Sequence, residues 1–189
     1  MSAASIANQL CVYFGGPYEP STHTYRTPQI SVQGMSGPIV RRAAPKRDDH
    51  ATDYHVTGSA AAGVPIGCLM LILAEQGSEQ RVAMGGAVSG VKQVRHQIRM
   101  HAFLRCESSY AEDAQDAEYA LVDAIRARIE ADRTCGSGGF EAGYGVGFQV
   151  GEGGAPWMRW TASPIHTTQR DLSKGYVLVE FMADEYIQA

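Results

Sequence analysis

The sequence predicts an α+β fold in which a mainly antiparallel sheet carries one long helix packed on a face. Three observations lead to this prediction: residues 92–106 alternate between apolar and polar side chains, residues 109–132 repeat apolar side chains at helical spacing, and strand-like segments occur on both sides of that helix. Strands grouped before and after one helix favour an antiparallel sheet. The chain has 189 residues, the length of one ordinary domain. We therefore expect a single domain over residues 1–189.

The first 63 residues show the weakest pattern. LCVYF (residues 10–14) fits either a short strand or the end of a short helix, and Gly15-Gly16-Pro17 ends it. Prolines interrupt residues 18–63, where only QISVQ (29–33) resembles a strand. So long a structureless stretch is unusual inside a compact domain. We expect residues 18–63 to form a long proline-containing N-terminal arm or insertion, ordered against another surface.

Two strand patterns follow the arm. IGCLMLILA (66–74) is typical of a buried strand, EQGSEQ (75–80) predicts a turn, and residues 81–84 predict its hairpin partner. KQVRHQIRMHAFLRC (92–106) then alternates strictly, which predicts a strand with one dry and one wet face. The dry face carries Val94, His96, Ile98, Met100, Ala102, Leu104 and Cys106; the wet face carries Gln93, Arg95, Gln97, Arg99, His101, Phe103 and Arg105.

The long helix is predicted over residues 109–132. Ser109 and Glu112 fit a capping box, in which each side chain bonds the other residue's amide. Acidic residues occupy the first turns and basic residues the last, as the helix dipole favours. An apolar stripe suited to one face of a sheet follows at helical spacing: Ala114, Ala117, Leu121, Ala124, Ile125 and Ile129.

The remainder predicts more strands. A glycine-rich connector between 136 and 154 includes a strand-like segment at 144–150, and WMRW (157–160) follows. YVLVEFMA (176–183) is apolar on both faces, which indicates a central or well-covered strand.

Composition limits the classes of function. The net charge of −4 excludes a molecule that is polycationic overall, so any nucleic-acid contact needs a local patch. The four cysteines are far apart and form no metal or redox motif, which favours small buried hydrophobes in a reducing compartment. We see no signal peptide, and the longest apolar run, residues 66–74, is too short to span a bilayer. We expect no membrane association.

Enzyme signatures are missing. The sequence holds no GxxxxGK[ST] phosphate loop and no GxSxG elbow, and GYGVG (143–147) has the wrong spacing and context for a dinucleotide loop. The cluster KRDDHATDYH (46–55) contains metal-ligand types without a metal-site spacing. His96 and His101 differ in parity, so they point to opposite faces and cannot share a metal. We therefore predict no catalytic residue, no cofactor and no metal.

A basic run lies within the predicted arm. Arg41, Arg42, Lys46 and Arg47 predict contacts of the arm with a partner. The partner is either nucleic acid or an acidic protein surface.

The wet face of the strand at 92–106 raises a question of charge. Arg95, Arg99 and Arg105 repel one another unless carboxylates lie nearby. The alternatives are a simple pairing within the chain and a contact with a neighbouring subunit. We predict a subunit interface or channel face formed by the basic wet face and the acidic start of the helix: Arg95, Gln97, Arg99, His101, Arg105, Glu112, Asp113 and Asp116.

The order of these elements resembles a known family. A hairpin, a long strand with a polar end, the helix SYAEDAQDAEYALVDAIRARIEAD (109–132) and closing strands ending in YVLVEFMADEYIQA resemble the tail terminator proteins of long-tailed bacteriophages over about residues 65–189. The resemblance rests on element order and on the character of the helix. It implies a virion protein that forms a ring, usually of six subunits, on the finished tail tube and presents a surface to the head connector. The family has no catalytic residues.

The resemblance implies several partners. They are other copies of the chain, the tail tube protein and a head-completion or connector protein, with DNA crossing the channel only transiently, and assembly in the host cytoplasm. Another neck or tube component, such as a head-closure protein, is the nearest alternative. The rival from another class is a small-molecule binding α+β domain, with a pocket near Trp157 and Trp160.

Overall fold

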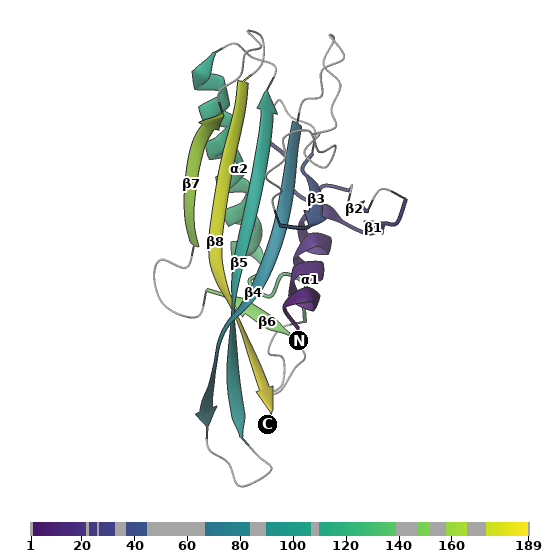
Figure 1. Cartoon of the computed structure of the whole chain (residues 1–189), viewed down its shortest axis with the longest axis vertical. Helices are drawn as coiled ribbons and strands as arrows, with labels where there is room; N and C mark the ends of the chain where they lie inside the picture. The colour runs from purple at the N-terminus through teal and green to yellow at the C-terminus, as the bar shows by residue number, and fades with distance from the viewer. Residues whose placement is uncertain are drawn as a thin grey trace.

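The structure is a computed structural model that describes residues 2–21, 23–25, 27–32, 37–44, 67–83, 90–106, 110–138, 147–151, 158–165 and 173–188. It contains two helices and eight strands in these ranges (Figure 1). The helices are α1 (Ala3–Gly15) and α2 (Ala111–Ala131). The strands are β1 (Tyr18–Glu19), β2 (Thr24–Tyr25), β3 (Ile39–Arg42), β4 (Gly67–Ala83), β5 (Val91–Cys106), β6 (Phe148–Val150), β7 (Met158–Ile165) and β8 (Ser173–Gln188).

All eight strands belong to one sheet. Its order is β1-β2-β3-β4-β5-β8-β6, and β7 also pairs with β8. Every pairing is antiparallel except that of β3 with β4. The predicted α+β class with a mainly antiparallel sheet is therefore confirmed. The number of domains stays a prediction.

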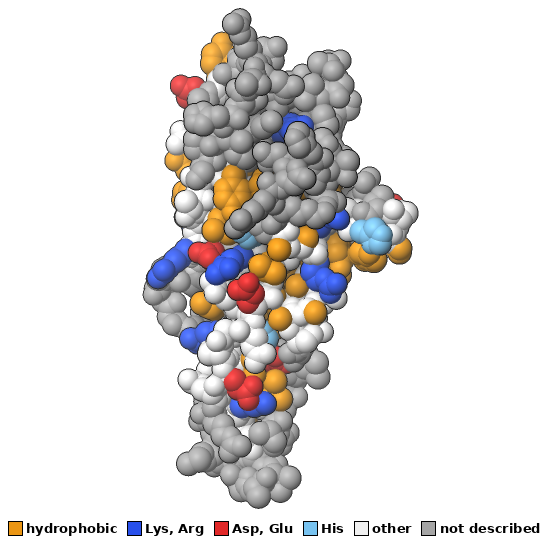
Figure 2. Space-filling model, viewed as in Figure 1, with side chains coloured by type: hydrophobic (Ala, Val, Ile, Leu, Met, Phe, Trp, Pro, Cys, Tyr) orange, Lys and Arg blue, Asp and Glu red, His pale blue; other side chains and the backbone are white. Residues whose placement is uncertain are grey.

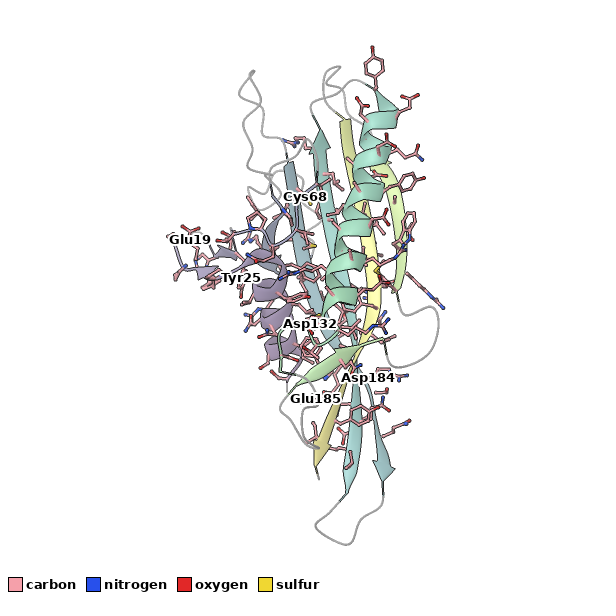
Figure 3. All side chains as sticks on the ribbon, turned by 180° about the vertical axis from the view of Figure 1, so that it is seen from behind. Glu19, Tyr25, Cys68, Asp132, Asp184 and Glu185 are labelled. Carbon is pink, nitrogen blue, oxygen red and sulfur yellow. The ribbon has the colours of Figure 1, made fainter. Side chains whose placement is uncertain are left out.

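Both helices contribute to one apolar core on the same face of the sheet. α2 lies across β5 and β8, and α1 lies beside it against β3 and β4 (Figures 1 and 3). The core joins Leu10 of α1, Ile125 of α2 and the dry face of β5. That face carries the predicted residues Val94, Ile98, Met100, Ala102 and Leu104, all buried. The alternation of β5 is thus confirmed, because only one of its faces meets the helices.

α1 was not predicted as a helix of this length. Ser2 caps it by accepting a hydrogen bond from the Ser5 amide at 3.2 Å, and Gly16 ends it with a φ of 72°. Such a conformation is easily adopted only by glycine. Ile6, Leu10 and Phe14 recur every four residues and are fully buried. The fold therefore has a second helix besides the predicted long one.

The prediction of an arm over residues 18–63 is not confirmed. In the part of this range that the structure describes, β1, β2 and β3 add to the edge of the sheet beside α1. β3 runs parallel to β4, with Val40 opposite Met70, so these residues belong to the core layer. Prolines indicated an absence of long strands, and they are compatible with these short ones. The cluster at 46–55 lies outside the described residues.

The predicted turn at residues 75–80 is wrong. β4 continues through this polar segment to Ala83, still paired with β5, and its pairing shifts by one residue between Gln76 and Ser78. The polar residues 75–80 are exposed because this part of β4 extends beyond the ends of the helices (Figure 1). β4, β5 and the end of β8 stay paired as the sheet twists, and they continue as an extension, which we define as residues 77–83, 91–95 and 184–188 (Figure 1).

The predicted capping box of Ser109 and Glu112 stays a prediction. α2 begins at Ala111 with Tyr110 as its N-cap, and the Tyr110 side chain makes no capping hydrogen bond. Ser109 lies outside the described residues. The acidic first turn, Glu112 and Asp113, is as predicted. The described parts of the chain contain no helix that is both long and apolar enough to cross a bilayer.

Candidate functional site

The wet face of β5 lies on the side of the sheet that carries no helix, and basic and acidic side chains alternate there (Figure 2). Arg95 pairs with Asp184 of β8, and Arg99 pairs with Glu180 of β8 and with Glu75 of β4. On the opposite face of the sheet, Lys92 pairs with Glu79 of β4 at 3.0 Å. The carboxylates come from the two neighbouring strands, because antiparallel pairing places facing residues side by side.

Two of these pairs differ in burial. The Asp184 side chain is 0% exposed and accepts hydrogen bonds from Arg95 Nε at 2.8 Å and from its Nη2 at 3.3 Å. The hydrogen bond to Asp184 raises the pKa of Arg95. Arg99 Nε lies 3.1 Å from Glu180, whose side chain is 35% exposed. The first pair is therefore a shielded contact, and the second is open to water.

The structure separates the predicted interface residues into two groups. Arg95, Gln97, Arg99, His101 and Arg105 share the wet face of β5. Glu112, Asp113 and Asp116 are exposed near the start of α2, which packs on the other face of the sheet. The partners of Arg95 and Arg99 within the chain are thus the strand carboxylates, and not those of the helix. A role of either group at a subunit interface stays a prediction.

A second ionisable pair lies directly behind the first. His96 Nε2 is 3.3 Å from Glu185 Oε2, and the two residues are 1% and 3% exposed. Burial lowers the pKa of His96, and its Nδ1 has no partner in the described part of the chain. Consecutive residues of β5 therefore pair with consecutive residues of β8 on opposite faces of the sheet. Asp184 and Glu185 lie where the sheet narrows into the extension (Figure 3).

His101 forms a smaller cluster higher on the wet face. Its Nδ1 lies 2.7 Å from the Tyr176 hydroxyl, and Tyr176 also packs against Phe103 at 5.2 Å between ring centroids. Burial lowers the pKa of His101, and the charge of Arg99 lowers it further. His96 and His101 lie on opposite faces of the sheet, as their parity predicts.

A concave surface occurs at the opposite edge of the sheet, beside α1. It has a volume of about 670 Å³, and the described residues that line it are Asn8, Val12, Tyr18, His23, Tyr25, Arg41 and Arg42. We call it the tyrosine–arginine pocket. It includes two of the four predicted arm-contact residues, and Lys46 and Arg47 lie outside the described residues. The sequence did not indicate the tyrosines and His23 as part of this site, because they are distant in sequence from the basic run. The pairing of β2 with β3 brings them together, with Tyr25 opposite Val40.

The described cysteines fit the predicted buried role. Cys11, Cys68 and Cys135 are buried free thiols. Burial raises the pKa of Cys11 and of Cys135 to about 12. Thiols with so high a pKa carry almost no thiolate and are poor nucleophiles or metal ligands at neutral pH. In the described ranges, no three His, Cys, Asp or Glu side chains are grouped as metal ligands.

No protein-family model matches the chain, and a search of curated proteins finds no significant match. The site is therefore interpreted from its geometry. The charge pairs of the wet face join β4, β5 and β8 and fix their register, since a slip of one residue would bring every charge to the other face. The tyrosine–arginine pocket is a concave surface whose described lining contains two arginines and no acidic side chain.

Proposed function

We propose that the protein is a structural subunit that associates side by side with further copies of itself into a ring, as the tail terminator of a long-tailed bacteriophage does. The observation that carries this proposal is the open edge of β4. β3 pairs only with residues 69–72 of β4, so β4 has a strand partner on one side alone from Leu73 to its end, among the residues that the structure describes.

An open edge of this length offers a row of unpaired backbone amides and carbonyls to another strand. β4 limits unwanted pairing with the irregularity at Gly77 and with the charged side chains of Glu75 and Glu79. Such features reject arbitrary strands and leave room for a matched partner surface. They are expected of a subunit that associates specifically and does not aggregate.

The edge of the sheet away from β4, formed by β7, carries an exposed aromatic surface. β7 pairs with β8 alone in the described part of the chain, and it carries an exposed aromatic pair with α2. Trp160 is 39% exposed and Tyr119 is 44% exposed, with their rings in edge contact at 5.8 Å between centroids. Exposed aromatic residues are enriched in protein interfaces. Two different lateral surfaces on one chain favour head-to-tail contacts, which close into rings or continue as filaments.

The phage role follows from the resemblance, and we propose the same partners that it implies: the tail tube protein and a head-completion or connector protein. DNA would cross the ring without lasting contact, and assembly would take place in the host cytoplasm. The charge pairs within the chain support this role, because paired arginines hold DNA less tightly than unpaired ones. We propose a structural role and not a catalytic one.

Electron microscopy of the purified protein tests this function. Closed rings one subunit high support a terminator, whereas extended tubes favour a tube protein. Trp160→Ala should reduce the fraction of protein in rings, and Arg159→Ala, on the same strand, should change it little. Particles of single-subunit size in every field, for the wild type, would contradict a ring-forming function.

A further inference from the structure

The elements that line the tyrosine–arginine pocket, α1 and β1 to β3, lie at the edge of the sheet away from β7 (Figures 1 and 3). Asn8 and Val12 of α1 form one wall, and Arg41 and Arg42 of β3 form another. Because these residues come from two packed elements, the pocket is part of the fold and not a gap between loops.

Aromatic side chains complete the pocket in an ordered way. Tyr18 packs against Tyr25 at 5.2 Å between ring centroids, and the Tyr18 hydroxyl lies 2.9 Å from His23 Nδ1. Tyr25 is only 5% exposed, and its hydroxyl donates to Asn8 Oδ1 at 3.5 Å. Tyr18 is 47% exposed at the rim. Tyrosines with an apolar body and a polar tip are suited to bind both side-chain carbon and carboxylate oxygens.

The charge of the pocket is basic. Among the described residues that line it, none is acidic and two are arginines. Arg42 is exposed and forms no salt bridge with the described residues. Its charge acts on the inner wall: burial raises the pKa of Cys11 to about 12, and Arg42 opposes that rise. An unneutralised guanidinium beside tyrosines favours an acidic partner.

The chain itself presents an acidic segment of suitable composition. Glu112, Asp113 and Asp116 are exposed on the first two turns of α2, and Tyr110 just before them is 69% exposed. Glu112 and Asp116 form no salt bridge with the described residues. This segment lies at the far end of α2 from Asp132, away from the labelled Tyr25 and Glu19 (Figure 3). It is therefore placed to contact a neighbouring molecule.

We propose that the tyrosine–arginine pocket of one copy binds the acidic start of α2 of the next copy. This inference rests on the proposed function, and it names the surfaces that meet. The proposed contact is consistent with the two lateral surfaces of the sheet. The acidic start of α2 belongs to the surface with β7, because α2 packs against β7. The pocket belongs to the surface with β3, which pairs with β4. Complementary charge sets the order of the two surfaces and rejects pocket-to-pocket contact.

Charge reversal tests the contact. Arg42→Glu, or Glu112→Lys combined with Asp116→Lys, should raise the protein concentration at half-association at least roughly tenfold, because like charges face each other in the contact. Combining all three substitutions in one chain should restore association, since each contact then pairs the reversed charges. Glu130→Lys, also exposed on α2 but in its last turn, is the matched control and should leave association unchanged.

Sedimentation velocity measures association, and the thermal melting of each variant checks its fold, which these exposed positions should preserve. Wild type that associates together with reversal variants that associate equally well would overturn the pocket contact alone. Loss of association in the reversal variants with no recovery in the combined variant would also overturn it. Wild type that stays at 20.4 kDa at every concentration would contradict both the contact and the proposed function.

Discussion

Arg95 donates two hydrogen bonds to the carboxylate of Asp184, at 2.8 Å and 3.3 Å, and the Asp184 side chain is completely buried beneath it. The residues are 89 positions apart in the chain and directly opposite in the β5–β8 register. On the other face of the sheet, His96 contacts Glu185 diagonally, because His96 itself lies opposite Ala183 in the register. The base of the extension is therefore held by ionisable pairs on both faces.

Arg95→Ala should destabilise the fold much more than Arg99→Ala. Without Arg95 the buried Asp184 carboxylate loses its partner. Removing one member of a fully buried pair costs about 3–5 kcal/mol. The cost here should be lower than that, because the Arg95 side chain is partly exposed. Arg99 and its partners are partly exposed, so its loss should cost about 0–1 kcal/mol. Urea unfolding of both variants measures the difference, and equal losses would show that the burial of Asp184 has no energetic effect.

Glu118→Gln should stabilise the protein at neutral pH. Glu118 is 7% exposed on α2, and burial raises its pKa. Because the folded-state pKa is raised, the protonated Glu118 side chain contributes stability that is fully present below the unfolded pKa of about 4.5. This stability is lost as the pH rises through the folded pKa, because the buried side chain then becomes charged. Glutamine removes this loss.

The comparison at two pH values checks the assignment. The free energy of unfolding of Glu118→Gln should exceed that of the wild type at pH 7, and the excess should shrink by pH 4. Glu130→Gln, exposed on the same helix, serves as the control. A benefit of Glu118→Gln that is the same at both pH values would rule out ionisation as the cause.

Gly175→Ala should destabilise the packing of α2 on β8. A methyl group at this position would overlap Glu118 Oε1 and lie 3.1 Å from its Cδ and 3.2 Å from its Cγ. The overlapping atom is the end of a flexible side chain, so the loss should lie near the lower end of the about 1–3 kcal/mol that overpacking costs. The loss should be smaller in a Glu118→Ala background, which a double-mutant cycle of unfolding free energies measures. Strict additivity of the two substitutions would exclude the contact as the reason for glycine here.

Asp132→Ala should loosen the turn after α2. The Asp132 carboxylate accepts hydrogen bonds from the Thr134 amide at 2.9 Å, the Thr134 hydroxyl at 2.6 Å and the Gly136 amide at 2.8 Å. Losing such a capping side chain costs about 1 kcal/mol. Asp123→Ala, whose side chain is 74% exposed, is the control and should cost less. Thermal unfolding compares them, and equal melting temperatures would show that the turn does not depend on these bonds.

The pH dependence of the wild type should reflect Asp132 in the acid range. Burial acts to raise the pKa of Asp132, but the hydrogen bonds from Thr134 and Gly136 outweigh it and lower the pKa. A lowered pKa gives stability above the unfolded value that is lost as the pH falls through the folded pKa. The difference between the wild type and Asp132→Ala should therefore disappear in strong acid.

The strands with clear periodicity could be predicted from the sequence, because local pattern alone decides which face is buried. β5 is the best example: the dry face from Val94 to Leu104 is buried on the side of the sheet that α2 covers, as its alternation indicates. β8 likewise contains the predicted segment 176–183. The course of β4 could not be predicted, since the exposed residues 75–80 have turn-like composition and remain a strand only through pairing with β5.

The partners in the candidate sites could not be predicted for a different reason. Asp184 meets Arg95 only through the pairing of two distant strands, and the acidic start of α2 was the nearer donor in sequence. The tyrosine–arginine pocket combines α1 with three short strands that prolines made hard to recognise. Tyr18 and Tyr25, on either side of a tight turn, were the available signal.

The native mass of the wild-type protein in solution tests the central proposal most directly. Sedimentation equilibrium over a wide range of concentrations should give a species whose mass is a whole-number multiple of 20.4 kDa, with one closed stoichiometry dominant at high concentration. A mass of 20.4 kDa at every concentration would contradict the account of a self-associating structural subunit.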